Sequence, residues 1–327
     1  MRSPTVRPRA PRDAGRLGTA KTVDLSVAVG SVTLPNPVMT ASGTAGHAAE
    51  LAPYLDLSAL GAVVVKSLHA EPWAGNPPLR VHETSAGMIN SVGLQGPGVA
   101  AWMTDDLPPL LATGARVVAS IWGRSVDEYA RAADLLAAAP AGVVAVEVNL
   151  SCPNTEAGRD LFAHSVDDTQ AVLRATEGCA RPRWAKLSPN TSRLVDVALA
   201  AREAGAEAVT LVNTVMGMAI DPEARTFRLG SGPRGGGLSG PAIHPVAVRA
   251  VFDVHAAAPD LPIVGVGGVT SGGDAAEMLL AGASAVQVGT ATFADPRAPA
   301  RVRDELERWA GRQGVSQVRD LIGEVHG

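Results

Sequence analysis

The chain has 327 residues, of which 46% are hydrophobic, 18% charged and 3% aromatic, and its formal net charge is −4. This length can bury a large core, and barrels of this size commonly form one domain. The near-neutral charge gives no reason to expect a nucleic acid or an anionic lipid surface as a partner. Its two cysteines, Cys152 and Cys179, do not make a disulfide framework, so a reducing cytoplasm is expected.

The first 22 residues differ from the rest. They contain five arginines and one lysine against a single acidic residue, Asp13, with three prolines and no apolar segment. A secretory signal needs an apolar segment, and prolines break the amphipathic helix of a transit peptide. We therefore expect residues 1–22 to be a disordered basic tail and residues 23–327 to be one catalytic domain. No apolar run approaches the ~18 residues of a membrane helix, so no membrane contact is expected.

Short apolar runs after this tail predict strands. Residues 23–29 and 31–34, with a turn at Gly30, are expected to form a hairpin at the bottom of a barrel. Pro37 cannot donate to a strand ladder, so it marks the start of a strand at 38–40. Further runs follow at 60–66, 117–121, 141–149, 183–186, 204–213, 263–266 and 281–289. Such continuous apolar runs, several of them preceded by a helix-ending glycine, are typical of parallel strands buried on both faces.

Amphipathic stretches separate several of these strands. In Val126–Leu136 the apolar residues recur at helical spacing. Eight alternating strand and helix units predict an α/β fold, a (β/α)₈ TIM barrel, with a doubly wound open sheet as the alternative. The glycine-rich segment 214–240 shows little apolar periodicity and is predicted to be a long loop, such as a lid over an active site.

Polar residues and glycines stand where the predicted strands end. In chain order they are Ser42, Lys66, Ser120, Asn149, Lys186, Asn213, Gly267, Gly268, Gly289 and Thr290. The active site of such a barrel lies at these ends, and lysines or asparagines there are costly unless they meet polar groups. The last two strands end in glycine-rich turns, whose exposed N–H groups beside a helix N-terminus indicate a phosphate site.

The segment EVNLSCPN, residues 147–154, places Cys152 just past a strand end and between amides. A free thiol has a pKa of ~8.5 and acts as a base or nucleophile when its surroundings are tuned. The alternative, a buried structural thiol, is common for cysteine but fits these polar neighbours poorly. Cys179, at a helix end, is assigned no function.

This segment resembles the signature of class 1 dihydroorotate dehydrogenases, and the resemblance runs from about residue 23 to the C-terminal helix. Matching blocks are NPVMTASGT (36–44), GNPPLR (75–80), GMINSVGLQ (87–95), KLSPN (186–190) and GGLSGP (236–241). Several such blocks in the same order are specific to a family.

The resemblance implies an activity and a cofactor. Members of the family oxidise dihydroorotate to orotate in pyrimidine biosynthesis, with a base that takes a proton from C5 while C6 gives a hydride to N5 of FMN. By its place in the motif, Cys152 is that base. Class 2 members use serine and are associated with membranes, so the cysteine indicates class 1.

The resemblance also implies site residues. Substrate-binding positions are Lys66, Asn90, Ser91, Val92, Gly93, Leu94, Asn149, Asn154, Asn213 and Thr214, whose amides and backbone suit the donors and acceptors of orotate. Positions for FMN are Ser42, Lys66, Ser67, Ser120, Asn149, Lys186, Val212 and Gly240, with Gly267, Gly268, Gly289 and Thr290 at the phosphate. Lys186 is expected at the flavin edge that gains negative charge on reduction.

Three positions depart from the family pattern. Ser120 stands where the family usually has a flavin-contacting asparagine, so that contact is expected to be weaker or remade. The run KSLH (66–69) and Trp73 also replace more usual residues. Of the remaining residues near the site, Met39 and Met88 are interpreted as core, Trp73 and Trp102 as packing or subunit surface, and His47 and His69 as solvated loop histidines.

Motif details, including Asn213-Thr214, are closer to class 1B than to class 1A. Class 1B enzymes pass electrons to NAD through a second subunit that carries FAD and an iron–sulfur cluster, whereas class 1A enzymes use fumarate. The chain has no cysteine cluster for such a centre, so we expect this partner subunit together with a homodimeric core. Two alternatives are a dihydropyrimidine dehydrogenase-like flavoenzyme and an inactive flavin-binding scaffold.

Overall fold

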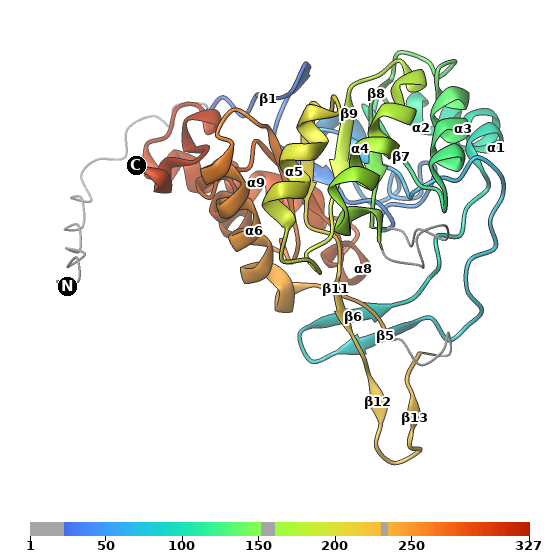
Figure 1. The fold of residues 1–327 in the computed structure, drawn as a ribbon. Helices are drawn as coiled ribbons and strands as arrows, with labels where there is room; N and C mark the ends of the chain where they lie inside the picture. The colour runs from blue at the N-terminus through green and yellow to red at the C-terminus, as the bar shows by residue number, and fades with distance from the viewer. Residues whose placement is uncertain (1–22, 152–160, 230–234) are drawn as a thin grey trace.

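The computed structural model describes residues 23–151, 161–229 and 235–327. Eight parallel strands form one curved sheet at the centre of the molecule (Figure 1). Their order around the sheet is β3 (Val38–Thr40), β16 (Ala285–Val288), β15 (Ile263–Val266), β10 (Ala208–Leu211), β9 (Arg183–Lys186), β8 (Val143–Asn149), β7 (Val117–Ile121) and β4 (Val63–Val64). Each of the eight predicted strands is present, which confirms the barrel and excludes the doubly wound sheet.

The barrel closes between β3 and β4. The Gly61 N–H donates to the Val38 carbonyl at 2.8 Å. The Thr40 hydroxyl accepts from the Val64 N–H at 2.9 Å and donates to the Val64 carbonyl at 3.3 Å. A side chain therefore replaces part of the backbone ladder at this joint.

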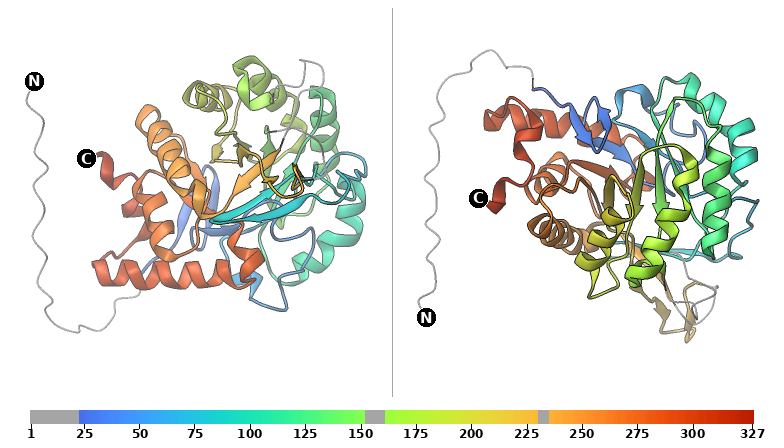
Figure 2. Two further views of the ribbon diagram at one scale, coloured as in Figure 1. Left: turned by 90° about the horizontal axis from the view of Figure 1, so that it is seen from below. Right: turned by 45° about the horizontal axis from the view of Figure 1, so that its top comes forward.

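Helices surround the strands, as the end-on view in Figure 2 shows. The longer ones are α3 (Val126–Leu136), α4 (Val166–Ala175), α5 (Leu194–Glu203), α6 (His244–Ala257), α7 (Gly272–Leu280) and α9 (Ala298–Gln313), and the shorter ones are α1 (Val99–Ala101), α2 (Leu107–Ala112) and α8 (Ala291–Ala294). Ser125 caps α3 by accepting from the Glu128 N–H, which explains why that helix begins where the periodicity predicts. In the described part of the chain, no helix is both long and apolar enough to cross a membrane.

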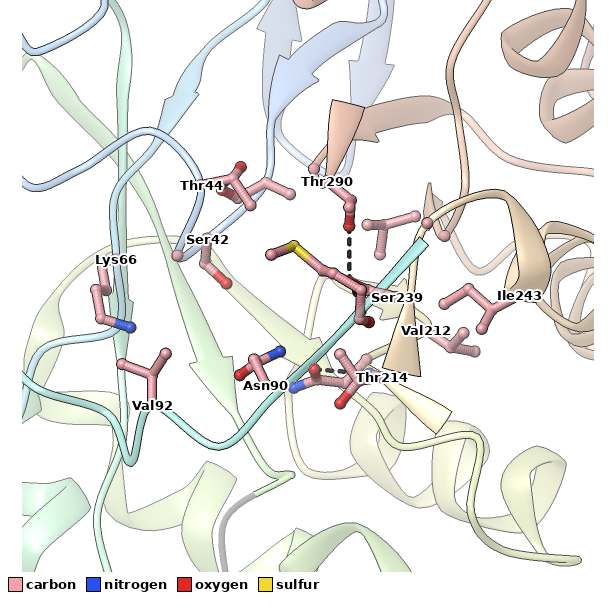
Figure 3. Close-up of a pocket in the computed structure, with 18 of the residues that line it drawn as sticks. Ser42, Thr44, Lys66, Asn90, Val92, Val212, Thr214, Ser239, Ile243 and Thr290 are labelled. Carbon is pink, nitrogen blue, oxygen red and sulfur yellow. Dashed lines mark hydrogen bonds between the residues drawn. The ribbon is translucent and has the colours of Figure 1, made fainter. Parts of the chain in front are cut away.

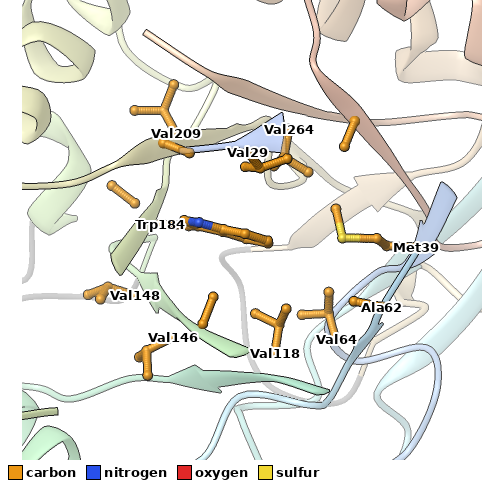
Figure 4. Packing of buried hydrophobic residues seen from close by; sticks show 14 of the residues in the cluster. Val29, Met39, Ala62, Val64, Val118, Val146, Val148, Trp184, Val209 and Val264 are labelled. Atoms are coloured by element: carbon orange, nitrogen blue, oxygen red, sulfur yellow. The ribbon is translucent and has the colours of Figure 1, made fainter. Parts of the chain in front are cut away.

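The interior of the barrel is packed with apolar side chains around Trp184 and Met39 (Figure 4). The predicted hairpin, β1 (Val27–Val29) and β2 (Val32–Leu34), lies at the bottom of the barrel, and its Val29 joins this cluster. Asp24 tethers the hairpin to the C-terminal segment, because its N–H donates to the Ser316 carbonyl at 2.9 Å and its carbonyl accepts from the Val318 N–H at 2.8 Å.

A second, antiparallel sheet lies across the opposite end of the barrel (Figures 1 and 2). Its order is β11 (Val215–Gly217), β14 (Gly236–Ser239), β6 (Gly87–Asn90) and β5 (Val81–Thr84), and the hairpin of β12 (Ile220–Asp221) and β13 (Thr226–Phe227) projects beyond it. The prediction that segment 214–240 is a loop without strands was therefore wrong. β14 pairs with β6, a partner far away in the sequence, so local periodicity could not show it, and β11 in turn pairs with β14.

Candidate functional site

A pocket opens between the carboxyl ends of the barrel strands and the antiparallel sheet. Figure 3 shows Ser42 and Lys66 on one side of it and Val212 and Ile243 on the other. The predicted site residues that line the pocket are Ser42, Lys66, Ser67, Asn90, Val92, Leu94, Asn149, Lys186, Val212, Asn213, Thr214, Gly240, Gly267, Gly268, Gly289 and Thr290. Residues from distant parts of the sequence thus share one cavity at the end of the barrel where active sites of this fold lie.

A buried ion pair lies in the wall of this pocket. Lys186, at the end of β9, places its Nζ 3.6 Å from Glu147 Oε1 and donates to Ser42 Oγ at 2.9 Å. Glu147 is fully buried, and its other oxygen accepts from Gln287 Nε2 at 2.9 Å. Because isolated buried charges are very costly, the carboxylate and the ammonium hold each other in place. The pocket therefore has a fixed positive charge in its wall.

A chain of side-chain hydrogen bonds ends on the same carboxylate. Asn213 Nδ2 donates to Asn149 Oδ1 at 3.3 Å, and Asn149 Nδ2 donates to Ser67 Oγ at 3.3 Å. Ser67 Oγ lies 2.9 Å from Ser120 Oγ, which donates to Glu147 Oε1 at 3.2 Å. If Ser67 donates to Ser120, every donor in this series of hydrogen bonds points towards Glu147. Ser120 is fully buried and is not among the residues that line the pocket, so it supports its neighbours.

The turns after β15 and β16 form a glycine cradle together with Gly240, which precedes the 3-10 turn Pro241–Ile243. Gly267 and Gly268 have φ angles of +138° and +66°. A Cβ at Gly267 would lie 2.6 Å from Ala247 Cβ, and one at Gly268 would lie 2.8 Å from the Gly240 carbonyl oxygen. Only glycine fits this turn, which brings bare backbone to the pocket.

The chemistry of this end of the pocket fits a phosphate group. Thr290, which follows β16, donates from its hydroxyl to Ser239 Oγ at 2.7 Å, and both side chains face the cavity (Figure 3). Among the described residues that line the pocket none is acidic, whereas Lys66 and Lys186 are cationic. Backbone donors, hydroxyls and cations together favour an anionic ligand.

Side-chain amides are grouped near the antiparallel sheet. Asn90, the last residue of β6, donates from Nδ2 to the Gly237 carbonyl at 3.3 Å. Asn213 Oδ1 accepts from the Thr214 N–H at 2.8 Å, and Asn190 Nδ2 donates to the Thr214 carbonyl at 3.0 Å. Amides offer donors and acceptors side by side, which suits a small planar ligand with carbonyl and N–H groups.

Not every predicted residue reaches the cavity. Ser91 and Gly93 are not among its lining residues: the Ser91 N–H donates to the Arg80 carbonyl at 2.9 Å, and the Gly93 carbonyl accepts from Trp73 Nε1 at 3.0 Å. They fix the loop that carries Val92 and Leu94 to the pocket. Cys152 and Asn154 lie outside the described residues.

His69 is buried, so its prediction as a solvated loop residue was wrong. Its Nδ1 lies 3.2 Å from Glu71 Oε2, its Nε2 lies 3.2 Å from Glu128 Oε2, and its ring centroid is 4.9 Å from that of Trp122. Glu128 belongs to α3, a partner that local sequence could not reveal. His47 is half-buried; burial lowers its pKa, and the ammonium of Lys66 lowers it further.

Other interpretations were partly correct. Met39 and Trp102 are fully buried, as predicted, whereas Met88 lines the pocket and does not belong to the core. Trp73 packs against Trp122, and the Arg124 guanidinium lies 4.7 Å from a Trp73 ring centroid.

Nine lining residues were not among the predicted site residues; they include the polar Thr44 and Ser239 and the apolar Ile243 and Phe293. Thr44 and Ser239 stand inside the NPVMTASGT and GGLSGP blocks, which could have indicated them. The two apolar residues carry no such signal.

Comparison with known proteins identifies the family of the chain. A family model described as dihydroorotate dehydrogenase matches residues 24–309. A relative from Desulforudis audaxviator named dihydroorotate dehydrogenase B (NAD(+)), catalytic subunit, is 50% identical over 305 residues, covering 93% of this chain and 98% of the relative. A relative of the same name from Geobacter sp. strain M21 is 45% identical over 303 residues, covering 92% of this chain and 98% of the relative.

A third relative carries a different name. This protein from Solibacter usitatus is named putative dihydroorotate dehydrogenase A (fumarate) and is 46% identical over 305 residues, covering 93% of this chain and 99% of the relative. The three relatives share the substrate in their names and differ in the electron acceptor. The family match and the extent of identity confirm the resemblance found in the sequence. The chain belongs to the dihydroorotate dehydrogenase family, whose members are flavin-dependent oxidoreductases.

Proposed function

We propose that this protein oxidises dihydroorotate to orotate, a step of pyrimidine biosynthesis, with FMN bound in the pocket. One observation carries the proposal: in a chain whose residues 24–309 match the family model, the described substrate and flavin positions converge on a single cavity, apart from Ser91, Gly93 and Ser120. The relatives' names give no support to a dihydropyrimidine dehydrogenase-like enzyme.

The cofactor fits the chemistry of the pocket wall. Gly267, Gly268, Gly289 and Thr290 would hold the phosphate of FMN with backbone and hydroxyl donors. Lys186 would stand at the ring edge where negative charge grows on reduction, held there by Glu147 and Ser42. When bound, the flavin supplies the acceptor for the hydride.

The substrate side is assigned to the amides and the cysteine loop. Asn90, Asn149, Asn213 and Thr214, with Asn154, would bind the carbonyl and N–H groups of the pyrimidine ring, and Lys66 would lie beside it. Cys152 would take the proton from C5 as the hydride leaves C6, so that the substrate loses two electrons and two hydrogens. Because Cys152 and Asn154 lie outside the described residues, their roles rest on the motif.

Anaerobic titration tests the substrate. Addition of dihydroorotate to the purified, flavin-loaded chain should bleach the flavin absorbance, and dihydrouracil should not. Bleaching by dihydrouracil alone would replace dihydroorotate dehydrogenase with the dihydropyrimidine alternative. Bleaching by neither compound would indicate an inactive scaffold.

A pair of cysteine variants tests the base. Cys152→Ala should keep its flavin and lose about 10²–10⁴-fold in turnover at neutral pH, because the proton at C5 has no acceptor. Cys179→Ala is the matched control: Cys179 is buried, burial raises the pKa of its thiol, and its Sγ donates to the Arg181 carbonyl at 3.5 Å. Equal turnover in the two variants would remove Cys152 from the mechanism.

The electron acceptor is proposed to be NAD, reached through a separate subunit with FAD and an iron–sulfur cluster. Two of the relatives described above are named as catalytic subunits of NAD(+) enzymes. The chain alone should then be reduced by dihydroorotate without forming NADH, and the partner subunit should restore NADH formation. Rapid reoxidation by fumarate without a partner would assign it to class 1A. A homodimeric core, a cytoplasmic location and a basic tail at residues 1–22 stay predictions.

A further inference from the structure

His244 is the first residue of α6 and stands directly behind the glycine cradle. Its Nδ1 lies 2.8 Å from the Gly267 carbonyl oxygen, and its Nε2 lies 3.1 Å from Glu277 Oε2 on α7. Its side chain is 12% exposed and is not among those that line the pocket. None of the motifs that identified the site singles it out.

The contact with Gly267 sets the direction of one backbone donor. A trans peptide group is planar, and its C=O and N–H point to opposite sides. The carbonyl of Gly267 and the N–H of Gly268 belong to one peptide group, so the N–H points away from His244. Gly268 lines the pocket, and a Cβ on it would lie 2.8 Å from His244 Cβ. The imidazole therefore backs the turn from the side opposite the cavity.

The other end of the turn is fixed independently. Asp274 Oδ2 accepts from the Thr270 N–H at 2.8 Å, from the Thr270 hydroxyl at 2.7 Å and from the Ser271 N–H at 2.9 Å. The peptide between Gly267 and Gly268 has no comparable anchor from Asp274, and glycine gives it the freedom to rotate. In the described structure, the contact with His244 therefore sets the orientation of this peptide group.

The ring of His244 has acceptors on both sides. A carbonyl faces Nδ1 and a carboxylate faces Nε2, and a carbonyl can only accept, so the contact with Gly267 uses an N–H at Nδ1. Glu277 therefore helps to hold the ring with an N–H directed at Gly267. The contact with Glu277 serves to position the ring, because Glu277 is not itself among the residues that line the pocket.

We infer that His244 is a positioning residue for the phosphate end of the pocket, acting through the Gly267 carbonyl to aim the Gly268 N–H at the phosphate of the flavin. The inference rests on the proposed binding of FMN. It predicts that His244 affects affinity for FMN but not for riboflavin, since the two differ only in the phosphate.

The test measures flavin binding to the full-length protein after its own flavin has been removed. Binding is monitored by the quenching of flavin fluorescence. In His244→Asn, Nδ2 can occupy the place of the imidazole Nδ1, so the ratio of FMN to riboflavin affinity should stay within about threefold of the wild type. In His244→Gln, the amide reaches the Nε2 position and leaves Gly267 without its donor. Its ratio should fall about tenfold, the typical effect of one hydrogen bond on binding.

The outcomes separate the inference from the proposed function. A wild type that binds FMN and riboflavin equally would overturn FMN as the ligand. If the wild type distinguishes the two flavins but His244→Gln keeps the same ratio of FMN to riboflavin affinity, the role of His244 is overturned. The same conclusion follows if His244→Gln weakens the binding of both flavins equally. Thermal unfolding shows which variants are folded, and if His244→Gln is not, His244→Ala removes the same donor and is judged by the same ratio. Glu277→Gln, which leaves Nδ1 in place, should keep most of the discrimination.

Discussion

Glu128 illustrates how a single charged residue can be buried at low cost. It stands in the first turn of α3, where it accepts from the Arg124 N–H and from the Arg124 guanidinium at 2.6 Å each. Burial raises the pKa of its carboxyl group, but the hydrogen bonds from Arg124 and His69 outweigh this effect and lower the pKa from 4.5 to about 2. Because the pKa is depressed in the folded state, the ionised carboxylate stabilises the fold.

This depressed pKa predicts how stability depends on pH. The contribution, about 3 kcal/mol, is present above pH 4.5 and is lost as the pH falls towards 2, with about 2 kcal/mol lost between pH 5 and pH 3. Urea unfolding over this range should therefore show a steeper loss for the wild type than for Glu128→Gln. Glu83→Gln, on an exposed position of β5, is the control and should follow the wild type. Parallel curves for the wild type and Glu128→Gln would contradict the prediction.

The element that joins fold and site most closely is the antiparallel sheet over the pocket. Its central strands, β6 and β14, pair from Gly237 opposite Asn90 to Ser239 opposite Met88. The residue just before this register, Gly236, has no room for a side chain, because a Cβ there would collide with the Asn90 carbonyl oxygen. The position of Asn90 therefore depends on a glycine in a different segment.

Gly236→Ala should displace Asn90 and weaken substrate-side binding. Overpacking of this kind costs about 1–3 kcal/mol, so the Kd for orotate, measured from the perturbation of the flavin spectrum, should rise roughly tenfold or more. The flavin content should change little, because the phosphate cradle is formed by other turns. In the control Gly273→Ala, the nearest atom to the new Cβ is Ser271 Oγ at 3.5 Å, and orotate binding should not change. An unchanged Kd in Gly236→Ala would show that the sheet can adapt.

At the scale of the whole molecule, the barrel depends on the joint between β3 and β4. Thr40→Val removes the hydroxyl that bonds both the N–H and the carbonyl of Val64 and should cost about 1–3 kcal/mol in the free energy of unfolding. Thr210→Val is the same substitution on another buried strand. Its hydroxyl has no hydrogen-bond partner in the described structure, so urea unfolding should show no loss or a small gain. Equal losses of unfolding free energy in both variants would mean that the hydrogen bonds of Thr40 at the joint do not stabilise the barrel.

Sequence reasoning succeeded where local pattern decides structure. Continuous apolar runs predict all eight barrel strands, and residues such as Lys186 and Asn213 reach the site because they follow strand ends. It failed where the partner of a residue lies elsewhere in the chain. The burial of His69 depends on Glu128 of α3, and β14 pairs with β6 from a distant part of the sequence.

The tether between Asp24 and residues 316–318 also bears on the order in which the molecule can be assembled. The hairpin that covers the barrel bottom leaves the ribosome long before the backbone groups of Ser316 and Val318 that hold it. Until then, apolar residues such as Val29 have no completed barrel to cover. Contacts between such distant segments slow folding and expose apolar surface during synthesis. Release of the chain as far as residue 318 is therefore a precondition for closing the bottom of the barrel core.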